Sequence, residues 1–84
     1  MTTRVYKRTF VVVDMIMKEI NEMVNFLFEN KLTCHIDTKD KEFYNGLIIE
    51  LHETFLVLND RVLGTTPLSF SAIETIEKFR EKEK

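Results

Sequence analysis

The 84-residue sequence has one cysteine, one proline, two glycines and no tryptophan. A single cysteine, Cys34, cannot form a disulfide within the chain, and this favours a reducing, cytoplasmic location. Two glycines are too few for a glycine-rich phosphate loop, which excludes the common nucleotide-binding motifs. The longest apolar runs have four residues, far fewer than the roughly 20 of a membrane-spanning helix. We therefore expect a cytoplasmic protein with no membrane partner.

The remaining composition is typical of a small folded domain. Apolar residues make up 44% of the chain and charged residues 31%, as in folded, soluble proteins. A chain of this length buries only about 60–65% of its unfolded surface, so self-association would add useful stability. The lack of glutamine and the many Ile, Lys and Glu residues are similar to thermophile sequences, although an AT-rich genome gives the same bias.

The net charge of −2 is unevenly distributed along the chain. Residues 1–13 contain Arg4, Lys7 and Arg8 and no acid, whereas residues 42–60 contain four acids and no lysine or arginine. A protein that binds polyanions through a whole face needs that face to be basic. This chain has at most a basic N-terminal arm that could contact phosphates; a solvated chain end is the alternative.

Helical periodicity begins after Asp14. Apolar residues recur at the spacing of one helix face, at Ile16, Ile20, Met23, Val24, Leu27 and Phe28. Asp14 is expected to cap this helix, and Asn30 to end it in the left-handed conformation. The apolar face is expected to cover the core. A second role in binding a protein partner is the alternative, because Met-rich surfaces adapt to partners.

After the helix, the apolar period changes from 3.6 to 2. Leu32, Cys34 and Ile36 alternate with polar residues, which predicts a half-buried strand with Cys34 as a core thiol. Further short strands are predicted over residues 43–52, 55–58, 68–70 and 72–76. Gly46 indicates a bend or bulge in the first of these, and Pro67 is expected at the start of the 68–70 strand, where its missing N–H does least harm.

A helix followed by about five short, strongly bent strands predicts a mainly β (α+β) fold. Such strands tend to close on themselves, because a flat sheet of this size leaves its edges exposed. The expected architecture is an N-terminal helix followed by a five-stranded antiparallel SH3-like barrel. It divides the chain into an arm or short strand over residues 1–13, a helix plus barrel over residues 14–78, and a charged tail over residues 79–84.

Two segments carry spaced motifs. The first reads G-x-I-x-x-L-H and ends in V-L-N-D at residue 60; the second has L-G at 63–64 followed by apolar residues at 68, 73 and 76. These motifs resemble those of the Sm-like (LSm) family, and the resemblance covers about residues 14–78. It implies a closed homo-oligomeric ring that binds single-stranded RNA or scaffolds a ribonucleoprotein.

In Sm-like proteins, RNA bases stack on a side chain of the loop after the second strand, and an Arg-Gly loop of the neighbouring subunit contacts them. Here His52 stands where the family has an aspartate, and Ser69-Phe70 replaces Arg-Gly. The residues that the resemblance implies as RNA contacts are Asn45, His52, Thr54, Phe55, Ser69 and Phe70. Stacking on a ring tolerates any base. The alternative is that Phe55 packs into the core and His52 only caps the hairpin.

No metal or enzyme site is predicted. Cys34 and His35 are adjacent on a strand, so their side chains point to opposite faces and cannot chelate one ion. Glu50, His52 and Glu53 are close in sequence, but a hairpin loop on so small a barrel lacks the pocket that catalysis needs. We expect no catalytic residue, no metal and no cofactor.

Two functions from different classes remain. The first is a non-enzymatic Sm-like RNA binder, assembled by pairing the edge over residues 66–70 with the 72–76 strand of a neighbouring copy. The second is a protein-interaction or oligomerisation module on a small SH3-like barrel without an RNA site. The negative charge and the missing Arg-Gly favour the second.

Overall fold

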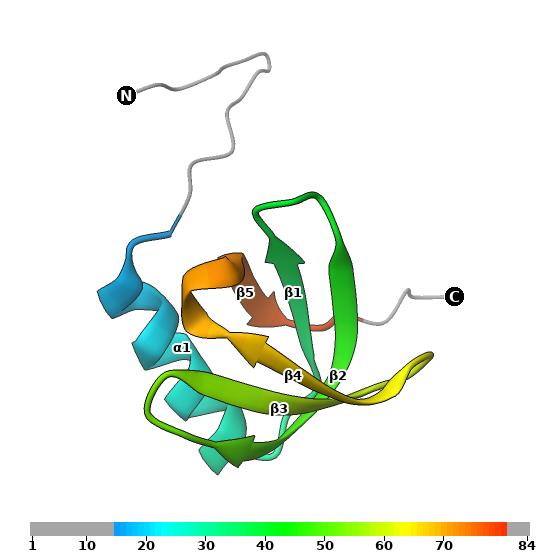
Figure 1. Ribbon diagram of the computed structural model, residues 1–84. Coiled ribbons are helices and arrows are strands. Elements are labelled where there is room, and N and C mark those ends of the chain that lie inside the picture. Colours follow the sequence, from blue (N-terminus) through cyan, green and yellow to red (C-terminus); the bar gives the residue numbers. More distant parts are fainter. Residues whose placement is uncertain (1–14, 81–84) are drawn as a thin grey trace.

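A computed structural model describes residues 15–80 and shows one helix followed by a five-stranded antiparallel sheet. The elements are α1 (Met17–Glu29), β1 (Cys34–Thr38), β2 (Phe43–Leu51), β3 (Phe55–Asp60), β4 (Gly64–Ser69), the 3₁₀ turn η1 (Phe70–Ala72) and β5 (Ile73–Lys78). The strand order is β4-β3-β2-β1-β5. Figure 1 shows a strongly curved sheet with α1 against it. The predicted mainly β (α+β) fold with its N-terminal helix is confirmed for the described residues.

The ends of α1 differ from the predicted ones. Ile16 holds the N-cap position, where its N–H donates to the Glu19 carboxylate at 3.1 Å; Asp14 lies outside the described residues. The prediction of a left-handed Asn30 is wrong, because Asn30 has φ −96° and the next residue, Lys31, has φ 54°. Asn30 instead donates its side-chain amide to the Phe26 carbonyl at 2.8 Å. It therefore caps the helix from a right-handed backbone.

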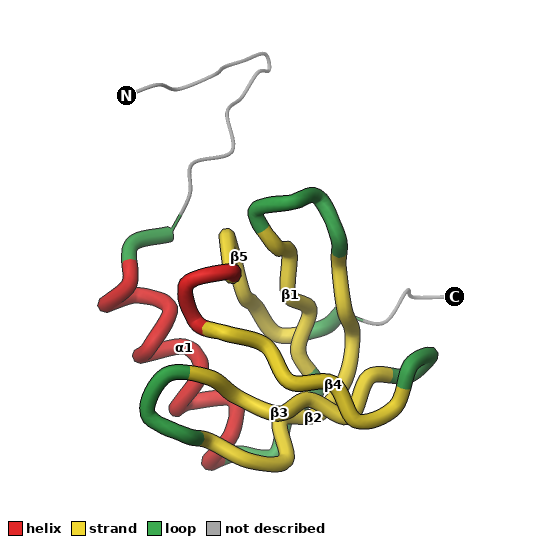
Figure 2. Tube along the Cα trace, viewed as in Figure 1, coloured by secondary structure: helices red, strands yellow, loops and turns green. Residues whose placement is uncertain are grey.

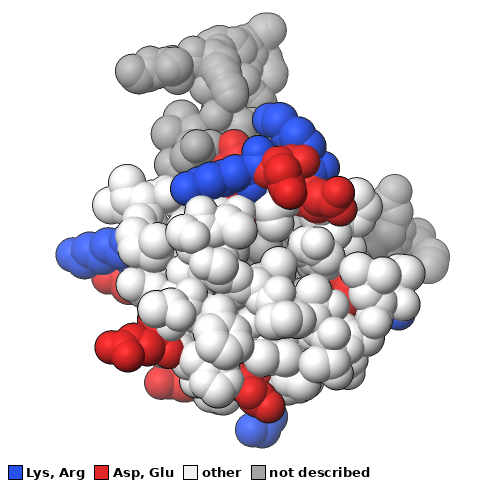
Figure 3. All heavy atoms as spheres, in the orientation of Figure 1, with Lys and Arg blue, Asp and Glu red and all other residues white. Residues whose placement is uncertain are grey.

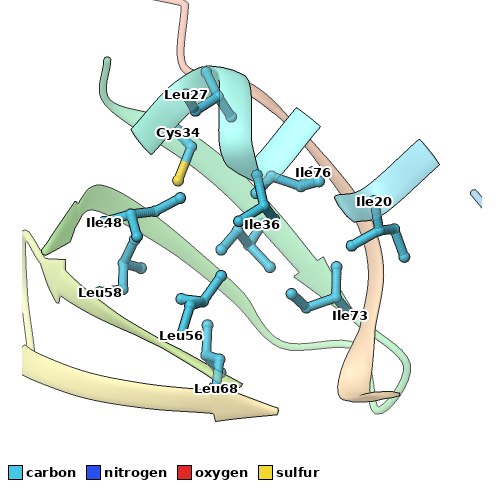
Figure 4. Packing of buried hydrophobic residues seen from close by; sticks show 11 residues of the cluster. Ile20, Leu27, Cys34, Ile36, Ile48, Leu56, Leu58, Leu68, Ile73 and Ile76 are labelled. Carbon is cyan, nitrogen blue, oxygen red and sulfur yellow. The ribbon is translucent and has the colours of Figure 1, made fainter. Parts of the chain in front are cut away.

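The core lies between α1 and the concave side of the sheet (Figure 4). Its buried members come from the helix and all five strands: Ile20, Val24, Leu27, Cys34, Ile36, Ile48, Leu56, Leu58, Leu68, Ile73 and Ile76. Burying one such side chain contributes about 1.5–3 kcal/mol. The helical period predicted this face correctly except for Ile16, which is 61% exposed at the helix start.

Cys34 is fully buried, which confirms it as a core thiol. Burial raises the pKa of the thiol to about 12, although a backbone hydrogen bond acts in the opposite direction. Because the thiolate is the reactive and metal-binding form of cysteine, this side chain serves packing.

The fourth strand differs most from the prediction. β4 begins at Gly64, and Pro67 lies inside it, opposite Val57 of β3. The expectation that Pro67 starts a strand is therefore wrong. Its position is tolerated because β4 is an edge of the described sheet and needs partners on one side only. Phe70 is not part of a strand but begins the turn η1.

The irregularity in β2 is at Ile49, three residues after Gly46, where the sequence predicted a bend or bulge. The register between β2 and β3 shifts between Ile48 and Glu50, whereas Gly46 pairs regularly with both Cys34 and Asp60. A Cβ at Gly46 would lie 2.7 Å from the Asn59 carbonyl carbon and 2.9 Å from the Asp60 Cα. Glycine is therefore required by the close approach of the β3 backbone.

We expect Gly46→Ala to lower the free energy of unfolding by at least about 2 kcal/mol, because the new methyl group overlaps backbone that cannot move aside alone. Gly64→Ala is the matched control: Gly64 has φ +81° and open space around it, so only backbone strain of about 1–2 kcal/mol is added. Urea denaturation of the three proteins gives the comparison. A Gly46→Ala loss smaller than that of Gly64→Ala would contradict the steric argument.

Candidate nucleic-acid interface

The loop between β2 and β3 lies beside the turn that links β4 to β5. Phe70 donates its N–H to the Thr54 carbonyl at 3.0 Å, and Phe55 pairs with Ser69 across the β3–β4 ladder. His52 closes the hairpin by donating its N–H to the Phe55 carbonyl at 2.9 Å. Figure 2 shows this loop and η1 next to each other, close to α1. Five of the six predicted contact residues therefore meet at one surface, which we call the hairpin surface: His52, Thr54, Phe55, Ser69 and Phe70.

Two rings are already stacked at the hairpin surface. The His52 and Phe55 rings have centroids 4.4 Å apart and an interplanar angle of 13°. The Nε2 atom of His52 lies 2.7 Å from the Glu50 carboxylate, and the His52 side chain is 44% exposed. Phe55 is half-buried and outside the core cluster. The pair thus presents an ordered aromatic platform that reaches solvent.

A hollow of about 400 Å³ adjoins this platform, between α1 and the two turns. Its lining residues are Met17, Asn21, Glu53, Thr54, Ser69, Phe70 and Ser71. Within it the hydroxyl groups of Ser69 and Ser71 lie 2.9 Å apart. Met17, Asn21 and Ser71 were not among the site residues predicted from the sequence. Met17 and Asn21 are four residues apart on one flank of α1, but only the folded chain shows that this flank meets the turns.

The electrostatics of the hairpin surface are acidic. Glu50 and Glu53 belong to the hairpin, and no lysine or arginine lines the hollow. Figure 3 shows a face whose centre is largely uncharged and whose charged groups lie around its rim. Carboxylates repel phosphates, so this surface offers no favourable contact to the backbone of a nucleic acid.

Asn45 lies away from the hairpin surface, so its predicted place among the RNA-contact residues is wrong. It is near the start of β2, where its Oδ1 lies 2.6 Å from His35 Nδ1 and its N–H donates to the Asp60 carboxylate at 2.9 Å. These contacts hold the opposite end of the strand. The predicted arm residues Arg4, Lys7 and Arg8 lie outside the described residues.

Asp60 is the centre of that opposite end. Its buried carboxylate accepts N–H bonds from Asn45, Val62 and Leu63, each at 2.9 Å. Burial opposes ionisation, but the N–H donors of Leu63, Val62 and Asn45 outweigh it, and the pKa of Asp60 is lowered. The carboxylate thereby fixes the turn between β3 and β4.

A second hollow, of about 430 Å³, lies beside this turn. Phe43, Val62 and Leu63 line it and are 65%, 88% and 65% exposed. The Arg61 guanidinium lies nearby, 4.5 Å from the centre of the Phe79 ring. Aromatic and arginine side chains beside exposed aliphatic ones are typical of protein-binding surfaces. We call this hollow the turn surface.

The comparisons leave the family open. The sequence matches no protein-family model and no curated protein. In residues 15–80 no helix is long and apolar enough to cross a membrane, and no three His, Cys, Asp or Glu side chains are grouped as a metal site would require. The Sm-like resemblance therefore stays a prediction.

The Asp60 network predicts a specific dependence of stability on pH. Because its folded pKa is lowered, Asp60 stabilises the fold fully above its unfolded pKa of about 3.9, and this contribution is lost as the pH falls through the folded pKa. We expect Asp60→Asn to cost about 1–3 kcal/mol at pH 7, and the difference from the parent protein to shrink below about pH 4. Denaturant titrations between pH 2 and 7 measure this difference in the free energy of unfolding, and Glu77→Gln, at an exposed residue, is the control. A difference that stays constant with pH would contradict the role of the charge.

Proposed function

We propose that this protein is an Sm-like, non-enzymatic RNA-associated protein that binds the bases of single-stranded RNA at its hairpin surface and assembles into a homo-oligomeric ring. One observation carries the proposal. Five residues that the sequence motifs single out, from two separate segments of the chain, form one continuous surface with an exposed ring stack: His52, Thr54, Phe55, Ser69 and Phe70.

Binding proceeds through stacking and hydrogen bonds, and no covalent bond changes. A base stacks on the His52–Phe55 platform, which contributes about 1–3 kcal/mol per base and tolerates any sequence. The hydroxyl groups of Ser69 and Ser71 and the amide of Asn21 in the adjoining hollow offer donors and acceptors to its polar edge. Single-stranded RNA is the class that exposes such bases.

Assembly follows from the two edges of the described sheet. β4 and β5 are the terminal strands, and only the three-residue turn η1 separates them in the chain. Pairing β4 of one copy with β5 of the next buries both edges, and a head-to-tail contact closes into a ring when the rotation fits. Several platforms on one ring bind the same strand with a high effective concentration, which compensates for a weak single site.

A second function is favoured by a separate observation. The turn surface exposes Phe43, Val62 and Leu63 together, while the hairpin surface lacks cations. These features suit a protein-interaction or oligomerisation module without an RNA site. On α1, Met17 and Phe26 are 46% and 52% exposed. These apolar side chains give the helix a second surface that suits a protein partner.

We expect His52→Ala to weaken binding of an oligo-U strand by about 5- to 150-fold, the equivalent of one lost stack. The matched control is Phe43→Ala, because Phe43 is an exposed ring at the other end of β2. Fluorescence anisotropy at several salt concentrations measures the affinity. Equal effects of the two variants, or no binding at low salt, would refute the proposed RNA site.

Native mass spectrometry of the protein purified at low salt without nuclease tests the assembly. We expect a closed oligomer of several identical chains that carries RNA, because edge pairing and base stacking act together. A bare ring would favour the scaffold or interaction module. A bare monomer or dimer would contradict the Sm-like assembly.

A further inference from the structure

The outer edge of β5 already binds one residue from the chain before the helix. Met15 donates its N–H to the Glu74 carbonyl at 3.2 Å, and the Ile76 N–H lies 3.4 Å from the Met15 sulfur. Alternate residues of a strand direct their backbone groups to opposite sides. The backbone N–H and C=O groups of Glu74, Ile76 and Lys78 therefore point away from β1, and those of the residues between them point toward β1.

The far end of β5 agrees with this alternation. Phe79, an odd-numbered neighbour of the strand, donates its N–H to the Thr33 carbonyl at 2.9 Å, on the β1 side. At this end, Thr33 follows the end of α1 and Phe79 follows the end of β5. At the other end, Met15 precedes the start of α1 and Glu74 lies at the start of β5. The helix and β5 thus run in the same direction.

A hollow of about 440 Å³ starts at the same Met15 and continues along α1. It is lined by Met15, Glu19, Glu22, Met23 and Phe26, and Phe26 is 52% exposed. The hollow combines apolar side chains with two carboxylates. It lies next to the β5 edge, because Met15 belongs to both.

The segment that ends at Met15 has the composition that this place requires. Residues 10–13 are Phe-Val-Val-Val, strong strand formers. Ten extended residues span about 33 Å, more than the roughly 20 Å of a 13-residue helix. The segment is long enough to follow the whole groove.

We propose that residues 10–14 add a sixth strand to the outer edge of β5. The direction follows from the hollow. A chain that fills it and ends at Met15 runs from Phe26 toward Met15, antiparallel to α1 and therefore to β5. Continuing the Met15–Glu74 contact in this direction sets Val13 opposite Ile76 and Val11 opposite Lys78, and the Val13 carbonyl then replaces the Met15 sulfur as the acceptor of the Ile76 N–H.

This docking closes the edge that a neighbouring copy would use. While the N-terminal segment is bound, β5 has no free side for the β4 of another copy, so docking within the chain and ring assembly exclude each other. This consequence rests on the proposed ring; the docking itself does not.

NMR of the full chain tests the docking. Val12 and Glu77 form a non-hydrogen-bonded pair in this register, so we expect a contact between their Hα protons. The amides of Val11 and Val13 should exchange about tenfold or more slowly than in an unfolded chain. Absence of both signals overturns the proposal. A mixture of labelled and unlabelled protein separates the sources: a contact seen only between chains means that a second copy occupies the edge, which also overturns it.

Variants supply the second test. Val13→Pro removes an N–H of the pairing and should abolish the protection of Val11, whereas Thr3→Pro, outside the proposed strand, should preserve it. Equal effects of the two proline variants contradict the docking. Val13→Pro should also free the β5 edge for assembly. If docking is observed in the parent protein and the variant remains a monomer by native mass spectrometry, the proposed ring is contradicted and the docking is not.

Discussion

The change of partner along β2 is the constraint on which the other features depend. Its first residues pair with β1 and its last residues with β3, and Gly46 is the residue that pairs with both Cys34 and Asp60. A strand shared in this way bends, because its two halves follow different neighbours. The bend lets a five-stranded sheet wrap around a core that one helix covers. Only glycine fits at the shared position, since the β3 backbone occupies the space of a Cβ.

The two ends of the β2–β3 pair carry different chemistry. At one end Asp60 binds three backbone N–H groups, so its charge is used internally to hold a turn. At the other end the Glu50 carboxylate bonds the His52 ring, which stacks on Phe55. The first end combines this internal carboxylate with the exposed turn surface, whereas the second presents oriented rings to solvent. A long curved ladder thus separates two accessible surfaces of different chemistry.

Periodicity predicted what depends on neighbouring residues in the chain. The helix face, the buried Cys34 and the succession of one helix and five strands along the described part of the chain all follow from local spacing. Contacts between distant segments were missed or misplaced. Pro67 lies within β4 because that strand is an edge, which is a property of the whole sheet. Asn45 was wrongly predicted as a site residue, because β2 is nine residues long and Asn45 lies near the end opposite the hairpin loop. Asn21 lines the hollow because α1 packs beside the two turns, and no local sequence pattern predicts that contact.

If the proposed RNA binding and docking hold, the acidic hairpin surface and the N-terminal segment are linked through avidity. Without cations at the platform, one copy gains little from RNA phosphates, and stacking alone gives weak binding. Useful affinity then requires several platforms on one assembly. That assembly requires a free β5 edge, and Met15 already holds the chain at this edge. Occupation of a single strand edge would therefore control an RNA affinity that is generated elsewhere on the molecule, because it sets how many platforms act together.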